Sequence, residues 1–279
     1  MSRWYAFNGD ADGLCALQQL RLDDPGPARL VTGVKRDVQL VKRLECVRGD
    51  EATILDIALD QNRDDVRRLL ENDVTVRYFD HHYPGDVPRH ARFHGHIDTA
   101  ADVCTSILVD RHRDGRHSAW AIVAAFGDGL EVVAGGQART HGYSSQDAAV
   151  LRRLGMCLNY NAYGESITDL HWDPAQLAEA MRPFGDPLTF ARDGEVFARL
   201  SAGYDHDMSQ ARALRPVVAG EGAMLVVMPN AAWARRAIGA YANELAQRRT
   251  GTRGSGSSAR RRPLRSPRPA HRPGTQREE

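Results

Sequence analysis

A short β-branched and aromatic run that ends in an acid and two imidazoles constrains this chain more than any other stretch. Residues 74–79 read Val-Thr-Val-Arg-Tyr-Phe and are followed at once by Asp80, His81 and His82. The run is typical of a buried strand, and open α/β folds bind ligands beyond the carboxyl ends of their strands. A carboxylate and two imidazoles suit a divalent ion such as Mn²⁺. For this tripeptide alone, an Asp that caps a turn beside two exposed histidines is an equally good interpretation.

Strands and helices alternate along the first hundred residues. We expect strands at 4–7, 29–34, 52–58 and 74–79, an edge strand at 92–97, and helices starting at 14, 38 and 62. This spacing predicts βαβ units, and therefore an α/β fold with a doubly wound parallel sheet. From residue 101 the pattern is helical, with helices expected at 103–112, 119–126, 145–158, 174–182 and 209–214.

The later part of the chain predicts an incomplete second domain. We expect a metal-binding domain with a helical extension over 1–200, a linker over 201–222, and the start of a truncated α/β substrate-binding domain over 223–248. The tail, 249–279, has Leu264 as its only large aliphatic residue. Because such a segment buries little apolar surface, we expect it to be disordered. A shifted reading frame would give the same composition, and the sequence leaves both explanations open.

The net charge of +1 hides a division between the tail and the rest. The tail carries nine arginines against two glutamates, so the preceding residues carry 28 basic and 34 acidic side chains. An acidic body is unsuited to general duplex-DNA binding, which depends on neutralising phosphates. It is expected if clustered carboxylates hold cations.

The location of the protein is predicted from its cysteines and its hydropathy. The four cysteines are far apart and form no Cys-x-x-Cys pair, which favours reduced thiols. No apolar run approaches the roughly 20 residues of a membrane span, and the first residues lack the pattern of a signal peptide. We therefore expect a cytoplasmic protein with no membrane partner.

Several acids follow predicted strands. Asp10 and Asp12 follow the first, Asp56 closes the third and Asp80 the fourth, while Asp128 follows a buried helix. The carboxyl ends of parallel strands share one edge, so these acids should converge there. Their repulsion would cost several kcal/mol without cations, and a pair of divalent ions about 4 Å apart would offset it.

A calcium-binding loop is the competing interpretation of residues 8–13. Asn8, Asp10 and Asp12 have the spacing of an EF-hand opening, but position twelve would be Gln19 instead of a bidentate glutamate. The preceding segment is also strand-like, so we do not expect a calcium sensor. P-loop and dinucleotide-binding patterns are absent from the sequence.

Four segments in order resemble the motifs of the DHH phosphoesterase superfamily. They are Asn-Gly-Asp-Ala-Asp-Gly at 8–13, Ile-Leu-Asp at 54–56, Asp-His-His at 80–82 and Gly-Asp-Gly at 127–129. Cys-Thr-Ser at 104–106 is similar to a small-hydroxyl segment between the third and fourth motifs. The resemblance runs over most of 3–245. It implies hydrolysis of phosphodiester or phosphoanhydride bonds with Mn²⁺ or Mg²⁺, as in single-strand exonucleases, oligoribonucleases, pyrophosphatases and exopolyphosphatases.

The same resemblance implies roles for individual residues. Asp10 and Asp56 would hold one ion, and Asp12, Asp56, His81 and Asp128 the other. His82 would face the substrate phosphate, and Asp80 would orient His81. The nucleophile would be a hydroxide activated by two metal ions.

Two features depart from the family pattern. Asn8 stands where many members have histidine, so a first ion would bind less tightly to its weak amide oxygen. The glycine-rich, histidine-containing loop that normally grips the substrate has no counterpart after 224–247. Arg235 and Arg236 could contact phosphate instead, although solvated helix residues are the alternative.

We therefore expect a two-metal phosphoesterase that acts on short single-stranded oligonucleotides or small phosphorylated molecules. The alternative enzyme is a polyphosphate or pyrophosphate hydrolase. The alternative outside enzymes is a degraded, non-catalytic module that binds metal and nucleotide, favoured by Asn8 and the missing loop. The sequence predicts no oligomeric state.

Overall fold

The computed structural model describes residues 1–219 and 224–251. The expected disordered tail therefore lies, from residue 252 on, outside the described residues. The chain divides into two units, 1–242 and 243–279. The second is described only over the end of helix α10 (Ala232–Gly251).

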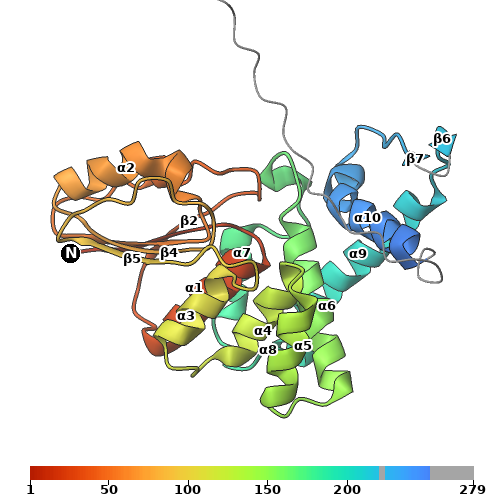
Figure 1. Ribbon diagram of the computed structural model, residues 1–279, viewed down its shortest axis with the longest axis horizontal. Coiled ribbons are helices and arrows are strands. Elements are labelled where there is room, and N and C mark those ends of the chain that lie inside the picture. Colours follow the sequence, from red (N-terminus) through yellow and green to blue (C-terminus); the bar gives the residue numbers. More distant parts are fainter. Residues whose placement is uncertain (220–223, 252–279) are drawn as a thin grey trace, which may run out of the picture. The chain divides into compact units, whose positions relative to one another are not determined.

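A five-stranded, all-parallel sheet with the order β2-β1-β3-β4-β5 forms the core of the first unit (Figure 1). Phe7 pairs with Leu55 and Leu55 with Phe79, so the three central strands end at one level. The chain leaves β1 toward one side of the sheet and continues from β3 toward the other, and doubly wound sheets bind their ligands beyond the carboxyl ends of two such strands. The doubly wound α/β prediction is confirmed. The strands are β1 (Arg3–Phe7), β2 (Arg29–Val31), β3 (Glu51–Leu55), β4 (Thr75–Asp80) and β5 (Phe93–Ile97).

Helices cover both faces of this sheet. Helix α2 (Leu59–Glu71) lies on one face, and α1 (Ala11–Asp23) and α3 (Thr105–His112) lie on the other (Figure 1). Trp4 and Ala6 pack into the core that α2 covers, while the alternate residues Tyr5 and Phe7 are also buried. Because both faces are covered, the three central strands are buried along most of their length, whereas the edge strands β2 and β5 are more exposed.

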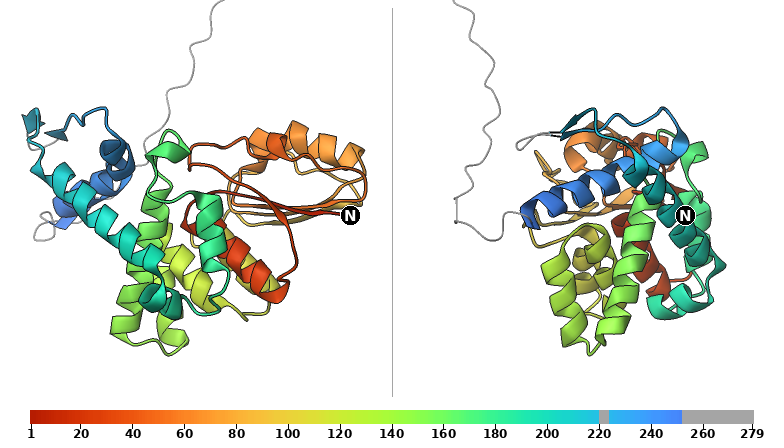
Figure 2. Two further views of the ribbon diagram at one scale, coloured as in Figure 1. Left: turned by 180° about the vertical axis from the view of Figure 1, so that it is seen from behind. Right: turned by 90° about the vertical axis from the view of Figure 1, so that its right-hand side faces the viewer.

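A helical extension packs against α1. Helix α4 contacts both α1 and α6. A Cβ atom on Gly127 would lie 2.4 Å from the Cβ atom of Ala11, and one on Gly155 would lie 2.2 Å from the carbonyl oxygen of Val123. These glycines therefore let α4 approach closely enough to bring Asp128 to the carboxyl edge of the sheet. The extension comprises α4 (Ser118–Gly127), α5 (Glu131–Thr140), α6 (Ser145–Asn161), η2 (Ile167–Asp169), α7 (Pro174–Met181), α8 (Pro187–Asp193) and α9 (Glu195–Ala213), all shown in Figure 2.

The predicted helix from residue 38 is wrong. Only a 3-10 turn, η1 (Val41–Arg43), forms there. The side chain of Asn62 accepts a hydrogen bond from the backbone N–H of Val41 and donates one to the carbonyl oxygen of Val38. These tertiary bonds satisfy the backbone without a helix.

The predicted linker over 201–222 is wrong for residues 201–213, which belong to α9. This stretch is rich in polar residues, so its helical periodicity is hard to recognise in the sequence. The buried side chains nevertheless form one stripe along the helix, at Leu200, Tyr204, Met208 and Ala211. The strand expected over 223–228 is shorter, because β7 (Met224–Leu225) pairs only with β6 (Val218–Ala219). Helices α5 and α8 were not predicted.

In the described residues, no helix has both the length and the apolar character that crossing a bilayer requires.

Candidate metal centre

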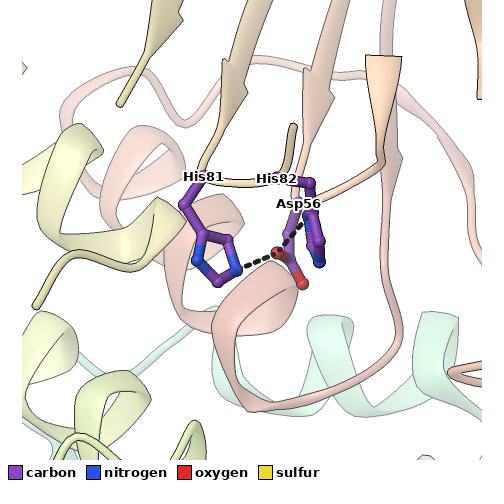
Figure 3. Close-up of side chains that lie close together, drawn as sticks. All are labelled: Asp56, His81 and His82. Atoms are coloured by element: carbon purple, nitrogen blue, oxygen red, sulfur yellow. Dashed lines mark ion pairs between the residues drawn. The ribbon is translucent and has the colours of Figure 1, made fainter. Parts of the chain in front are cut away.

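Three carboxylates surround one imidazole nitrogen beyond the carboxyl ends of β1, β3 and β4. The Nε2 atom of His81 lies 3.4 Å from Oδ1 of Asp56 and 3.9 Å from Oδ2 of both Asp12 and Asp128. His82 lies beside it, with Nδ1 3.9 Å from Oδ1 of Asp56 (Figure 3). Ligand atoms of Asp12, His81 and Asp128, and separately of Asp56, His81 and His82, lie within 4.8 Å of one another. Side chains from four predicted motifs thus meet as a group that could hold a metal ion.

Asp56 is held in an unusual backbone conformation. It follows β3 with φ at +57°, in the left-handed region that few residues other than glycine adopt, and it is 3% exposed. Its N–H donates to the carbonyl oxygen of Phe79 at 3.0 Å, and its Oδ1 accepts from Oγ1 of Thr105 at 3.3 Å. Such a conformation persists only where its surroundings enforce it, and it marks Asp56 as a candidate functional residue.

Asp12 is held by the first residues of α3. The backbone N–H groups of Thr105 and Ser106 donate to its two carboxylate oxygens, each at 2.7 Å. The hydroxyl of Ser106 donates to the carbonyl oxygen of Asp12 at 2.8 Å. The 104–106 segment noted in the sequence therefore orients Asp12, and the helix N-terminus stabilises its charge.

Asp10 caps α1 and pairs with a lysine. Its Oδ1 accepts the N–H groups of Asp12 and Gly13, and its Oδ2 accepts from Nζ of Lys35 at 2.6 Å. Burial alone would raise the pKa of Asp10, but Lys35 and the Gly13 N–H group bring that pKa below its usual value. Nζ of Lys35 also donates to Oδ1 of Asn159 at 3.2 Å.

Lys35 was missed by sequence reasoning. It lies in the loop after β2, where no motif marks it. The one available signal is that Lys35 and Lys42 are the only lysines among 37 basic residues.

Negative charge is in excess at this centre. Burial, and then the neighbouring charges of Asp10 and Asp12, raise the pKa of Asp56 well above its usual range. Burial and the same two neighbours raise the pKa of Asp128 to about 6. Without a cation, the folded protein therefore favours protons on these carboxylates.

The prediction that Asp80 orients His81 is wrong, because Asp80 pairs with His82 instead. Oδ1 of Asp80 lies 2.7 Å from Nδ1 of His82. This hydrogen bond raises the pKa of His82 against the effect of burial. The His82 side chain is 45% exposed, so an imidazole with a raised pKa stands at the solvent-facing side of the centre.

Asn8, the expected weak ligand, lies at the end of β1. Its Oδ1 atom is buried and has no hydrogen-bond partner within 1–219 and 224–251. A Cβ atom on Gly13 would lie 2.1 Å from the carbonyl oxygen of Asn8, so glycine is needed for α1 to start here.

The two arginines proposed as phosphate contacts are engaged elsewhere. Nη2 of Arg235 lies 2.6 Å from Oδ1 of Asp169, and Nη2 of Arg236 lies 2.7 Å from Oδ2 of Asp207. These pairs join α10 to the helical extension. A role in phosphate binding stays a prediction, which this geometry does not favour.

Two cavities in the structure lie apart from the metal centre. One cavity of about 560 Å³ is lined by Val34, Arg36, Asp37 and residues 165–168. Another, of about 510 Å³, is lined by Arg3, Glu51 and other residues near the amino ends of β1 and β3. Neither is lined by the carboxylates and histidines described above.

Comparison with known proteins finds similarity in structure. No protein-family model and no curated protein matches the sequence. The chain is similar to the exonuclease RecJ bound to manganese, with 17% identity and a TM-score of 0.51 over 76% of this chain and 64% of that chain. RecJ in complex with Mn²⁺ from Thermus thermophilus has 17% identity and a TM-score of 0.29, over 89% of this chain and 35% of that one. The first likeness shows a shared fold. A shared fold agrees with the resemblance found in the sequence.

Proposed function

We propose that this chain is a metal-dependent phosphoesterase of the DHH superfamily. One observation carries the proposal, namely the three carboxylates of Asp12, Asp56 and Asp128 within 3.9 Å of Nε2 of His81. They lie beyond the carboxyl ends of the strands, where doubly wound sheets bind their ligands. The fold shared with a manganese-bound exonuclease supports it.

The donor atoms fit a divalent ion. Three carboxylates and one imidazole suit Mn²⁺, and the oxygen-rich set also suits Mg²⁺. A cation would neutralise the repulsion that raises the pKa values of Asp56 and Asp128. When bound, it would polarise a phosphoryl oxygen and lower the pKa of a water molecule.

The remaining residues would position the ligands and the substrate. The N–H groups of Thr105 and Ser106 fix both oxygens of Asp12, so that carboxylate needs no reorientation to bind. Asp80 holds Nδ1 of His82, which leaves Nε2 as the donor toward a phosphate oxygen. The raised pKa of His82 keeps this imidazole positively charged over more of the neutral range.

The substrate class follows from charge and exposure. The acidic body disfavours duplex DNA, and the partly exposed His82 and Asp128 suit the end of a short single strand or a small phosphorylated molecule. A polyphosphate or pyrophosphate hydrolase is the alternative enzyme. The chain spans 64% of the length of the manganese-bound RecJ chain, so the activity of that whole protein is here a proposal.

A non-catalytic module is the second candidate. Asn8 offers only a neutral amide, and Asp10 is already paired with Lys35. Both features weaken one of the two expected ion positions. Binding of nucleotide without turnover would favour this candidate. For either function we propose a reducing cytoplasm, because all four cysteines are buried free thiols.

The test is Mn²⁺-dependent hydrolysis of a chromogenic phosphodiester by the full chain. A short single-stranded RNA and a polyphosphate are compared as substrates. We expect turnover that needs Mn²⁺ or Mg²⁺, that His81→Ala abolishes, and that His94→Ala preserves, because His94 is an exposed histidine on β5. Turnover that persists without divalent ions, or in His81→Ala, would overturn the proposal.

A further inference from the structure

The carboxylate of Asp10 already accepts three hydrogen bonds, one of them from a positively charged group. Oδ1 accepts two backbone N–H groups, and Oδ2 accepts the ammonium of Lys35 at 2.6 Å. The family resemblance places one of two ions between Asp10 and Asp56. An ion bound to Oδ2 of Asp10 at about 2 Å would share that oxygen with the ammonium, and the two positive charges would repel each other.

Lys35 is fixed in this place by its own surroundings. Its backbone N–H donates to the carbonyl oxygen of Ala162 at 2.9 Å, and its Nζ donates to Oδ1 of Asn159 at 3.2 Å. The ammonium also lies 5.6 Å from the centre of the Tyr163 ring. Contacts at the end of α6 therefore direct the side chain toward Asp10.

The loop that carries Lys35 is packed tightly on the first motif. A Cβ atom on Gly9 would lie 2.2 Å from the carbonyl oxygen of Gly33. Lys35 therefore approaches Asp10 from a loop that is in direct contact with the first motif.

We infer that this centre takes one divalent ion, at Asp12, Asp56, His81 and Asp128, and that Lys35 supplies the second positive charge at Asp10. The inference rests on the proposed function. It differs from the two-ion expectation because an ammonium already neutralises the carboxylate of Asp10, which the other ion would need as a ligand. An ammonium has three donors and no accepting atom, so it neutralises Asp10 and can also donate to a phosphate oxygen.

The residue types beside Asp10 agree with a centre that holds a single divalent ion. Asn8 replaces the histidine that would help to hold the other ion, and an amide is a weaker ligand. Lysine is a compact point charge, unlike the planar fork of arginine. Lys35 therefore suits a position beside a single carboxylate oxygen. Apart from Lys35 and Lys42, all lysine and arginine positions in the chain are arginines.

The experiment counts Mn²⁺ ions per chain by native mass spectrometry and records the electron paramagnetic resonance of the bound ions. For the full wild-type chain we expect one ion and the spectrum of an isolated Mn²⁺. In Lys35→Gln we expect a second ion and magnetic coupling between the two. The matched control is Lys42→Gln, because Lys42 is exposed and its Nζ donates to Oε1 of Gln39, away from the metal centre. It should keep one ion.

Two coupled ions in the wild-type chain would overturn this inference and leave the proposed function intact. A single ion in a folded Lys35→Gln protein would also overturn it, because Lys35 would then not exclude the other ion. The wild-type measurement decides the stoichiometry even where Lys35→Gln fails to fold. No bound Mn²⁺ in the wild-type chain would overturn both this inference and the proposed function.

Discussion

Two clusters of buried charge in this molecule are built in opposite ways. Between α6, α9 and α10, the carboxylate of Asp207 pairs with Arg236 and accepts the hydroxyl of Tyr160. Beyond the sheet, Asp56 lies among other carboxylates and its pKa is raised. Asp207 shows the reverse, because its partners outweigh the effect of burial and lower its pKa. We infer that paired charges hold the helices together, whereas excess carboxylates are arranged for a cation that the chain does not supply.

The largest expected effect is on activity at the metal centre. Asp56→Asn removes a charged ligand, and asparagine tolerates the left-handed backbone at this position. Loss of several kcal/mol of metal-dependent stabilisation corresponds to at least about a 10³-fold fall in kcat/KM. The unfolding temperature of the metal-free protein should hold or rise, because a repulsive charge is removed. A large loss of metal-free stability would contradict the contrast between the clusters.

The next largest effect is on the free energy of unfolding, through the cluster formed by Asp207, Arg236 and Tyr160. Asp207→Asn leaves Arg236 buried without its countercharge, which should lower the free energy of unfolding by about 3–5 kcal/mol. The affinity of the folded variant for Mn²⁺ should stay unchanged. Urea denaturation and calorimetric titration measure the two quantities. Weakened Mn²⁺ binding by the folded variant would show that the clusters are not independent.

The pH dependence of the two clusters should have opposite signs. The pKa of Asp128 is raised to about 6 in the metal-free protein, so the folded state binds more protons than the unfolded state in mildly acidic solution. Metal-free stability from this group therefore falls as the pH rises toward 6. The lowered pKa of Asp207 instead gives stability that is lost as the pH falls through its folded value.

Mn²⁺ binding should weaken as protons compete for Asp128. From Asp128 alone we expect about a tenfold rise in Kd for each pH unit below the pKa of this carboxyl, in addition to the competition of protons for Asp56. Titration of Mn²⁺ across the mildly acidic range measures it, and Asp128→Asn should flatten the profile. An equally steep profile in Asp128→Asn would assign the proton to another group.

The smallest expected effect is at Arg235. This residue forms a bidentate pair with the buried carboxylate of Asp169, so Arg235→Gln should cost about 1–3 kcal/mol. Because its guanidinium faces Asp169, we expect KM for an oligonucleotide to be unchanged. A several-fold rise in KM at constant kcat would instead support the phosphate contact predicted from the sequence.

The sequence predicts the convergence of Asp12, Asp56 and His81 because parallel strands end at one edge. Asp128 could be assigned only through the order of the motifs, since its position depends on how α4 packs on α1. Lys35 could not be predicted, because its approach depends on the path of an irregular loop. The pairing of Asp80 with His82 depends on side-chain rotamers, which the spacing of residues does not determine.

The most direct test of the metal centre is nitrogen hyperfine coupling in the electron paramagnetic resonance of bound Mn²⁺. We predict coupling from the imidazole of His81 in the wild-type chain, retained in His94→Ala and absent from any ion bound by His81→Ala. Bound Mn²⁺ without nitrogen coupling in the wild-type chain would contradict the assignment, as would coupling that survives in His81→Ala.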